Sequence, residues 1–236
     1  MTQPAAPNRS RQVSILGQNQ DEVSTLLGLN PLESSRLVTA TITTVGQDVA
    51  IASIDGQARK IGVLPISEFY PNKRWAQGNK YVLQELDQSE RPMLSAVRPE
   101  MIELLLAGVT PEIRSGAVRV MAAARVVGIR AKIAVAATVT GVDPVAACLG
   151  RGANRVAWLR EQLQGERVDV VAYSTDPETF IRNVFSSTTV ISATVTGSHA
   201  EVVVPKHNLE AALGGGGLNQ LLASRLTGLT VTIRSE

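Results

Sequence analysis

An internal repeat in the second half of the chain constrains its fold more than any other feature. The order helix, two strands, two helices and a strand is predicted twice between residues 100 and 233, with a period of about 60 residues. The first copy is expected over 100–107, 117–124, 131–139, 144–149, 154–163 and 167–173, and the second over 177–184, 190–196, 200–204, 209–213, 218–226 and 229–233. The repeat predicts two similar α+β domains in series.

A glycine turn separates the two adjacent helices in each copy: Gly150-Arg151-Gly152-Ala153 in the first and Gly214 to Gly217 in the second. Such a turn leaves free backbone N–H groups at the start of the following helix, where the helix dipole also favours an anion. Glycine removes the Cβ that would keep a sugar-phosphate backbone away. One such turn is more often a plain helix connection. Two turns at the same place in a repeat favour type II KH domains (α-β-β-α-α-β), which clamp single-stranded RNA.

The first part of the chain has a different pattern. Short β-branched segments are predicted as strands over 37–45, 49–54, 59–64, 81–86 and 92–95, and Asp55-Gly56 is typical of a hairpin turn. Five short strands in this space favour a small all-β barrel of the OB-fold kind. Residues 1–35 are rich in Gln, Asn, Ser and Pro and are predicted as a flexible N-terminal arm, with a short helix over 23–29.

The chain is therefore expected to be a multidomain α+β protein. Its predicted parts are the arm over 1–35, the barrel over 36–97, the first KH domain over 98–174 and the second KH domain over 175–236. The hydrophobic fraction of 44% is enough to form real cores.

Positive charge is concentrated in the first KH domain. Between residues 114 and 167 there are nine basic residues and three acidic ones, although the whole chain has a net charge of only +2. Scattered arginines are usually solvated, but Arg151 and Arg155 lie in and just after the first glycine turn, beside the predicted phosphate site. In the second KH domain, basic and acidic residues are roughly balanced. We therefore expect that domain to bind RNA less through charge, and more weakly.

Aromatic residues are scarce, at 3% of the chain. In the barrel, Tyr81 opens a strand and is predicted to pack in the core. Phe69, Tyr70 and Trp75 lie in a connection, where base stacking and loop anchoring are equally compatible with the sequence. The barrel is thus expected to contribute modestly to RNA binding.

The sequence offers no set of catalytic residues, so we expect no enzymatic activity, no cofactor and no metal. Cys148 is the only thiol and is predicted to be a packed core residue. Asp143-Pro144 and Asp176-Pro177 are typical helix starts rather than acid–base pairs. The single cysteine, with no signal-peptide or membrane-spanning pattern, predicts a cytoplasmic protein, which we expect to be a monomer.

Several segments resemble the RNA-binding core of the NusA family, which consists of an S1-type barrel and two KH domains. Those that match the first KH domain are Gly128–Val135, Asp143–Gly150 and Gly165–Val170. Leu213–Asn219 and Leu222–Gly228 look like the second. Ser95, Arg98–Glu100 and Val109–Ile113 resemble the join before the first KH domain, and Gly62–Glu68 is similar to the centre of an S1 barrel. The resemblance runs in unbroken order over roughly residues 36–235.

The sequence departs from the family pattern in four ways. Ala153 stands where the closing glycine of the first loop is expected, and the two variable positions of the second loop, Gly215 and Gly216, have no side chain. We expect the arm to replace the polymerase-binding domain that precedes the barrel in the family, and the acidic repeats that follow in some members to be absent. The resemblance implies RNA binding, and the parts that match do not by themselves imply a direct contact with RNA polymerase.

By this resemblance the function is that of a transcription elongation, termination or antitermination factor. Its ligand is single-stranded nascent RNA, and RNA polymerase or other elongation factors are further candidate partners. The expected RNA-binding residues are Arg125, Arg130, Lys132, Gly150, Arg151, Gly152, Asn154, Arg155, Lys206, Gly214, Gly215, Gly216, Gly217, Asn219 and Arg225.

Other functions are compatible with the same modules. The main alternative is an RNA-binding accessory factor in ribosome assembly or translation that never contacts polymerase. A protein-interaction scaffold with degenerate loops is another. The RNA-binding part of a phosphorolytic nuclease is disfavoured, because there the KH module precedes the barrel and accompanies a catalytic core.

Overall fold

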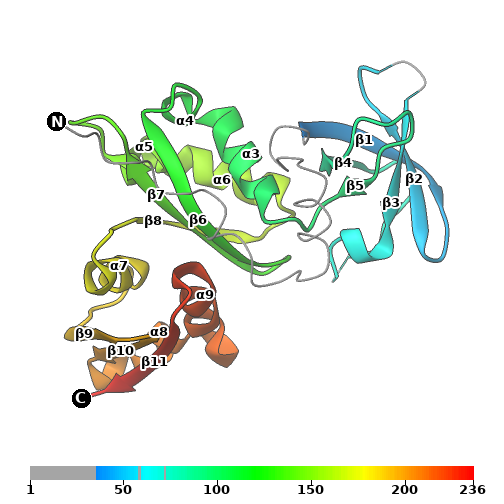
Figure 1. Cartoon of the computed structure of the whole chain (residues 1–236). Coiled ribbons are helices and arrows are strands. Elements are labelled where there is room, and N and C mark those ends of the chain that lie inside the picture. The colour runs from blue at the N-terminus through cyan, green and yellow to red at the C-terminus, as the bar shows by residue number, and fades with distance from the viewer. Residues whose placement is uncertain (1–35, 58–59, 72) are drawn as a thin grey trace.

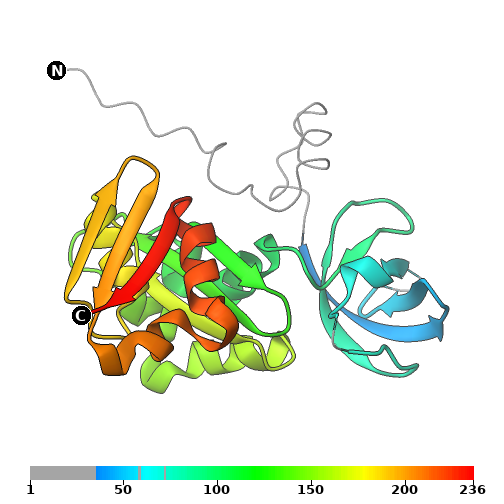
Figure 2. The same cartoon turned by 90° about the horizontal axis from the view of Figure 1, so that it is seen from below.

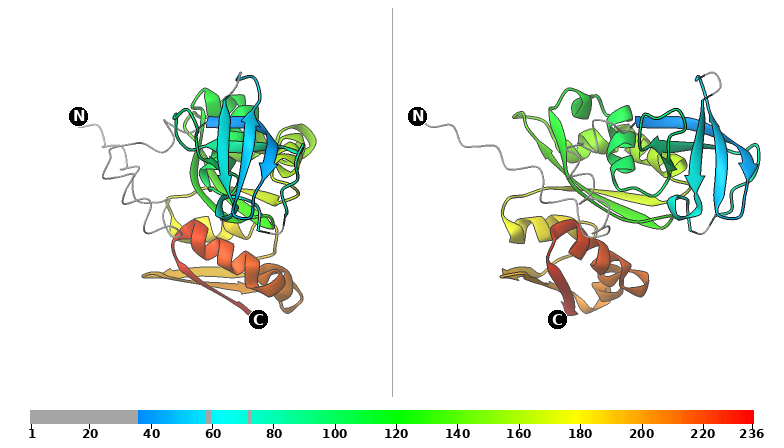
Figure 3. Two further views of the ribbon diagram at one scale, coloured as in Figure 1. Left: turned by 90° about the vertical axis from the view of Figure 1, so that its right-hand side faces the viewer. Right: turned by 45° about the vertical axis from the view of Figure 1, so that its right-hand side comes forward.

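A computed structural model describes residues 36–57, 60–71 and 73–236, which form a barrel followed by two KH domains (Figure 1). The barrel lies at one end of the molecule, and the two KH domains lie against each other beside it (Figures 2 and 3). The predicted arm, with its helix over 23–29, falls outside the described residues, as does Arg59 at the start of the predicted third strand.

The barrel is an antiparallel sheet with the strand order β3-β2-β1-β4-β5. Its strands are β1 (Arg36–Val45), β2 (Val49–Ile54), β3 (Ile61–Pro65), β4 (Lys80–Glu85) and β5 (Leu94–Ser95), and a 3-10 turn η1 (Ile66–Glu68) follows β3. The amide of Val63 in β3 donates to the carbonyl of Pro92, 2.9 Å away, just before β5. This contact joins the two edges of the sheet, so the barrel is nearly closed and its alternate residues form a core of their own.

The first KH domain has a three-stranded sheet in the order β6-β7-β8. Its elements are α3 (Glu100–Val109), α4 (Pro111–Arg114), β6 (Val118–Val126), β7 (Arg130–Ala137), α5 (Pro144–Leu149), η2 (Arg151–Ala153), α6 (Asn154–Gln162) and β8 (Arg167–Ala172). β7 pairs antiparallel with β6 and parallel with β8. Only the one-turn helix α4 and the 3-10 segment were not predicted.

The second KH domain repeats this topology, with the strand order β11-β10-β9. Its elements are α7 (Pro177–Val184), β9 (Ser192–Thr196), β10 (His199–Val204), η3 (Lys206–Asn208), α8 (Leu209–Leu213), η4 (Gly215–Gly217), α9 (Leu218–Thr227) and β11 (Thr230–Ser235). The central strand β10 again has an antiparallel neighbour, β9, and a parallel one, β11. The repeat predicted from the sequence is therefore confirmed, and so is the fold class.

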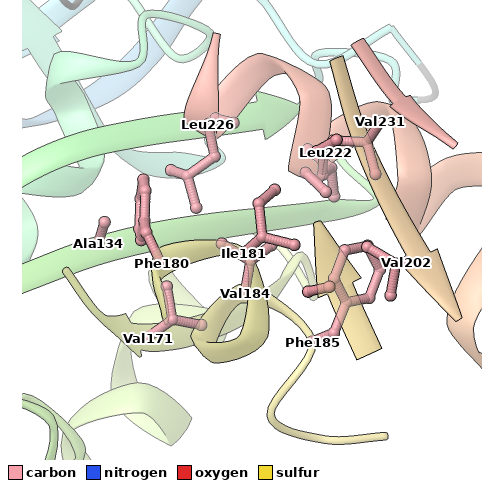
Figure 4. Packing of buried hydrophobic residues seen from close by; sticks show 14 of the residues in the cluster. Ala134, Val171, Phe180, Ile181, Val184, Phe185, Val202, Leu222, Leu226 and Val231 are labelled. Atoms are coloured by element: carbon pink, nitrogen blue, oxygen red, sulfur yellow. The ribbon is translucent and has the colours of Figure 1, made fainter. Parts of the chain in front are cut away.

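The two KH domains share one hydrophobic core. One face of the first sheet packs on α3, α5 and α6, and its other face packs on α7 and α9 of the second domain (Figure 1). Ala134 and Val171 of the first domain lie in the same cluster as Ile181 and Leu222 of the second (Figure 4). Small alanines on the first sheet let the helices approach closely, so the two domains bury a continuous apolar layer between them.

Arg125 joins all three domains. Its side chain is 1% exposed, and its Nε lies 2.8 Å and 3.0 Å from the two carboxylate oxygens of Glu166. Its Nη1 donates to the carbonyl of Ala96 at the end of the barrel, 2.9 Å away. From the second KH domain, Arg225 donates to the backbone carbonyl of Arg125 over 3.2 Å. Arg125 therefore fixes the barrel and the second domain to the first.

Candidate nucleic-acid interface

Helices α5 and α8, which precede the two glycine loops, begin in different ways. In the first KH domain, Asp143 accepts hydrogen bonds from the amides of Val145 and Ala146, and Pro144 is the first residue of α5. Asp176 starts α7 in the same way, accepting from the amide of Thr179. Both predicted helix starts are confirmed, because a side-chain acceptor satisfies amides that the first helical turn leaves free. In the second domain the short 3-10 turn η3 leads directly into α8.

The two loops have almost the same backbone conformation. Their first residues, Gly150 and Gly214, both have φ of 71°, with ψ of 175° and 161°. Their third residues, Gly152 and Gly216, have φ of 61° and 63°. The fourth residue is left-handed in both, with φ of 58° at Ala153 and 75° at Gly217. Two loops that differ at their second and fourth residues thus adopt one shape, which indicates that the domain fold contributes to it.

The first glycine of each loop is required by close packing as well as by its φ angle. A Cβ on Gly150 would clash with Oδ1 of Asn154 and lie 2.7 Å from Cγ of Arg155, and a Cβ on Gly214 would lie 2.9 Å from Cβ of Asn219. By contrast, Gly152, Gly215 and Gly216 have no atom within 4 Å of an added Cβ. The outer part of each loop is therefore open, and its backbone can be approached closely.

Each loop leads into the N-terminus of a helix of at least nine residues: α6 after the first loop and α9 after the second. Neither helix has a side-chain cap at its start. The amide of Asn154 donates to the carbonyl of Arg151, and that of Leu218 donates to the carbonyl of Gly215. No side chain caps the amides that follow, where the helix dipole favours an anion. Arg151, Gly152 and Asn154 are exposed at the first loop, and Gly215 and Gly216 are exposed at the second. Arg151 has no acidic partner within residues 36–57, 60–71 and 73–236.

Arg155 and Asn219 occupy equivalent places, five residues after the first glycine of each loop. Nη1 of Arg155 donates to the carbonyl of Ala147 in the last turn of α5, and it also lies 3.1 Å from a carboxylate oxygen of Glu112 in α4. Nδ2 of Asn219 donates over 2.8 Å to the carbonyl of Ala212 in the last turn of α8. The Arg155 side chain is 24% exposed, and Asn219 is 1% exposed. Both side chains thus turn toward the helix before the loop.

Three other predicted cations are engaged within the protein. Arg125 and Lys132 have side chains that are 1% exposed. Lys132 in β7 donates to Asp169 over 3.1 Å and to the carbonyl of Val184, at the end of α7, over 3.0 Å. Burial lowers the pKa of Lys132, and the charge of Asp169 opposes that shift. Arg130 is partly exposed and lies 2.6 Å from Asp169. The structure thus places Arg125 and Lys132 between domains, where single-stranded RNA cannot reach them.

The remaining predicted residues lie apart from the loops. Lys206 is exposed in η3, one turn before α8. Arg225 lies at the far end of α9 from the second loop and contacts the first domain. Further exposed arginines of the first domain, which were not among the predicted residues, are Arg114, Arg119, Arg160 and Arg167. The exposed cations of the first KH domain are therefore these four arginines and Arg151.

The acidic partners of several basic residues in the first KH domain were not predicted from the sequence. Glu112, Glu166 and Asp169 each hold a basic residue of the first domain in place. An acidic residue far away in sequence gives no local signal of such pairing.

The barrel aromatics form a buried cluster. Phe69 has its ring centroid 5.5 Å from those of Tyr70 and Trp75, and 5.1 Å from that of Tyr81. Phe69, Tyr70 and Tyr81 are buried, and Trp75 packs against the same core. Burial raises the pKa of Tyr70 to about 12. Of the two possibilities left open by the sequence, these rings anchor the loop. Tyr81 lies in the core as predicted.

Cys148 is fully buried, as predicted, and burial raises the pKa of its thiol to about 11. Among the described residues, no group of three or more His, Cys, Asp or Glu side chains is arranged to hold a metal ion. Within the same part of the chain, no helix is long and apolar enough to cross a membrane.

Comparison with protein families gives two adjoining matches. The NusA-like first KH domain matches residues 97–173, and the NusA-like second KH domain matches residues 177–236. The two matches include both glycine loops and together cover more than half of the chain.

Curated relatives extend the match into the barrel. The transcription termination/antitermination protein NusA of Mycobacterium tuberculosis (strain ATCC 25618 / H37Rv) is 37% identical over 183 residues, which are 74% of this chain and 53% of the relative. The protein of the same name from Bacillus subtilis (strain 168) is 33% identical over 181 residues, 74% of this chain and 49% of the relative. That of Thermus thermophilus is 36% identical over 175 residues, 71% of this chain and 45% of the relative. The chain thus spans about half the length of the curated relatives it matches.

Proposed function

This chain belongs to the NusA family, and from that premise we propose that it binds single-stranded nascent RNA and acts in transcription elongation, termination or antitermination. The observation that carries the proposal is the matched pair of loops. Gly150 to Ala153 and Gly214 to Gly217 share one backbone shape, and each leads into an uncapped helix N-terminus. Such a pair can hold the phosphates of one RNA strand at two points.

The proposed RNA surface consists of the open parts of the two loops and the helix starts behind them. In the first domain, Arg151, Gly152 and Asn154 are exposed there, and Arg151 supplies a positive charge. In the second domain, Gly215 and Gly216 allow RNA to approach the backbone without contributing charge. Lys206 is a candidate for an outlying contact. Arg125 and Lys132 are left out, because their charged groups are buried between domains.

The proposed mode of action is binding without catalysis, in the cytoplasm and as a monomer. RNA polymerase or other elongation factors are the proposed protein partners, because the relatives that match 74% of this chain are termination/antitermination proteins by name. The barrel is proposed to act mainly as a spacer, since its aromatic rings are committed to its own core.

The test is a crosslinking and pull-down experiment with the tagged chain in cells. Nascent transcripts and RNA polymerase subunits should be recovered together, and ribonuclease should release the RNA but not the protein partner. For the purified chain, RNA affinity should fall with salt at a log–log slope of about −0.7 per phosphate contact. Recovery of ribosomal particles in place of polymerase would instead indicate a role in ribosome assembly or translation.

A further inference from the structure

The two loops keep one shape although their sequences differ, so something outside the loops must set that shape. In the first loop the second and fourth residues are Arg151 and Ala153, and in the second loop both are glycine. Glycine loses more conformational freedom on ordering than any other residue, so four in a row have little tendency to hold one conformation. The second loop in particular needs an external support.

The position five residues after the first glycine provides that support in both domains. There Arg155 and Asn219 each donate a side-chain hydrogen bond to the last turn of the preceding helix, at Ala147 and Ala212 respectively. Helix α5 ends at Leu149 and α8 ends at Leu213, so neither carbonyl has an amide four residues ahead within its own helix. Each bond therefore ties the end of one helix to the start of the next, across the loop.

The same two side chains also cover the first glycine of each loop. An added Cβ on Gly150 would lie 2.7 Å from the Cγ of Arg155 and would also meet Oδ1 of Asn154. An added Cβ on Gly214 would lie 2.9 Å from both the Cβ and the backbone nitrogen of Asn219. A side chain packed this tightly against the loop and bonded behind it is not free to follow a ligand. For Arg155, the ion pair with Glu112 of α4 holds the guanidinium further in place.

We infer that Arg155 and Asn219 are positioning residues, which hold the two phosphate-binding loops in shape through a hydrogen-bond donor rather than contacting RNA through charge. The inference rests on the proposed function for its effect on RNA, and on the geometry alone for its effect on the loops. It explains why an arginine and a neutral amide can occupy the same place: both supply an N–H group to the end of the preceding helix.

The test compares two neutral replacements of Arg155. Arg155→Gln keeps a long side chain with an N–H donor, whereas Arg155→Met keeps the length and loses the donor. Arg155→Gln should bind single-stranded RNA within about twofold of the parent, with an unchanged salt slope. Arg155→Met should bind roughly three- to tenfold more weakly, the effect of one lost hydrogen bond, also with an unchanged slope. In the unbound protein, amide exchange over residues 150–158 should be faster for Met and unchanged for Gln.

Asn219→Leu is the matching change in the second domain and should speed amide exchange over residues 214–222. Ile181→Val, in the shared core and away from both loops, controls for a general loss of stability, which is about 0.5–1.5 kcal/mol for this kind of substitution. It should leave exchange in both loops and RNA affinity as in the parent.

Two results would overturn the inference. A reduction of the salt slope by about 0.7 in Arg155→Gln would mean that Arg155 contacts a phosphate directly. If Arg155→Met has the amide exchange rates and RNA affinity of the parent, the hydrogen bond from residue 155 is not needed to hold the loop in shape. If the parent chain binds no RNA, the proposed function fails. The amide exchange of the unbound variants still decides whether Arg155 and Asn219 hold the loops in shape.

Discussion

At the scale of single residues, the fourth loop position is alanine in the first loop and glycine in the second, yet its backbone is left-handed in both. Ala153 has φ of 58°, a left-handed conformation that glycine adopts freely and alanine does not. Gly217 has φ of 75° at the same place in the second loop. The sequence indicated this departure, but only the structure shows that alanine keeps the glycine conformation. The first loop therefore holds its shape against a local backbone preference.

Ala153→Gly should stabilise the first KH domain. Removing the Cβ relieves the strain of a left-handed alanine, which costs about 1–2 kcal/mol. The greater freedom of glycine in the unfolded chain reduces this gain by about 0.4–1 kcal/mol. We expect a net gain of roughly 0.5–1 kcal/mol in denaturant unfolding, with RNA affinity retained. Lower stability in the variant would show that Ala153 is not strained.

At the scale of elements, helix starts that depend on neighbouring residues could be predicted from the sequence, whereas contacts between domains could not. The starts of α5 and α7 follow from Asp-Pro pairs that act within a single turn, so the sequence was enough to predict them. Arg130 and Lys132 alternate along β7 in a way that is typical of a solvent-facing strand. The second KH domain packs on that face of β7. The sequence of β7 itself gives no indication of this contact. Lys132 was predicted to bind RNA as one of the basic residues of the first KH domain, whereas in the structure it donates to the carbonyl of Val184 at the end of α7.

Glu85 in β4 offers a test of the barrel. Its buried carboxylate accepts hydrogen bonds from Arg36 over 2.7 Å and from Lys60 over 2.5 Å. Burial alone would raise the pKa of Glu85, but these two cations outweigh burial and hold the pKa below its ordinary value of 4.5. Because the folded pKa is the lower one, the stabilisation is complete above pH 4.5 and is lost as pH falls through the folded pKa.

The barrel should therefore unfold more readily as the pH is lowered below about 4.5, and Glu85→Gln should flatten this dependence. Fluorescence of Trp75, which packs on the barrel core, can follow the transition in a Trp158→Phe background. Equal acid sensitivity in the Glu85→Gln variant and in the chain that keeps the carboxylate would rule out Glu85 as a source of acid lability.

At the scale of the whole molecule, the two KH domains use the same sheet face in different ways. In the first domain that face carries Ala134 and Val171 and is covered by α7 and α9. In the second domain it carries Thr194, Thr232 and the Glu201–Arg234 ion pair, all exposed. The first face is built for a neighbouring domain and the second for solvent. The two KH domains thus share a core that the repeat alone did not reveal.

Ile181→Ala, in α7 and fully buried in the shared core, should destabilise both KH domains together. A cost of about 2–5 kcal/mol is expected, from lost burial and the cavity left behind. Amide exchange in β7 and β10 should accelerate in parallel, whereas the exposed Arg182→Ala on the same helix should change little. Faster exchange confined to β10 would mean that the domains unfold independently.

The central claim is that the open loops bind the phosphates of single-stranded RNA, and Gly215 allows the most direct measurement of it. This residue has no neighbour within 4 Å of an added Cβ and no left-handed φ, so a side chain fits without disturbing the fold. Gly215→Asp should weaken RNA binding by roughly tenfold or more, through repulsion of the phosphate and competition for the start of α9. Gly215→Arg, which copies Arg151 of the first loop, should tighten binding and steepen the salt slope by about 0.7. If both variants melt like the parent and bind RNA with the parent's affinity, the second loop does not bind phosphate and the account is contradicted.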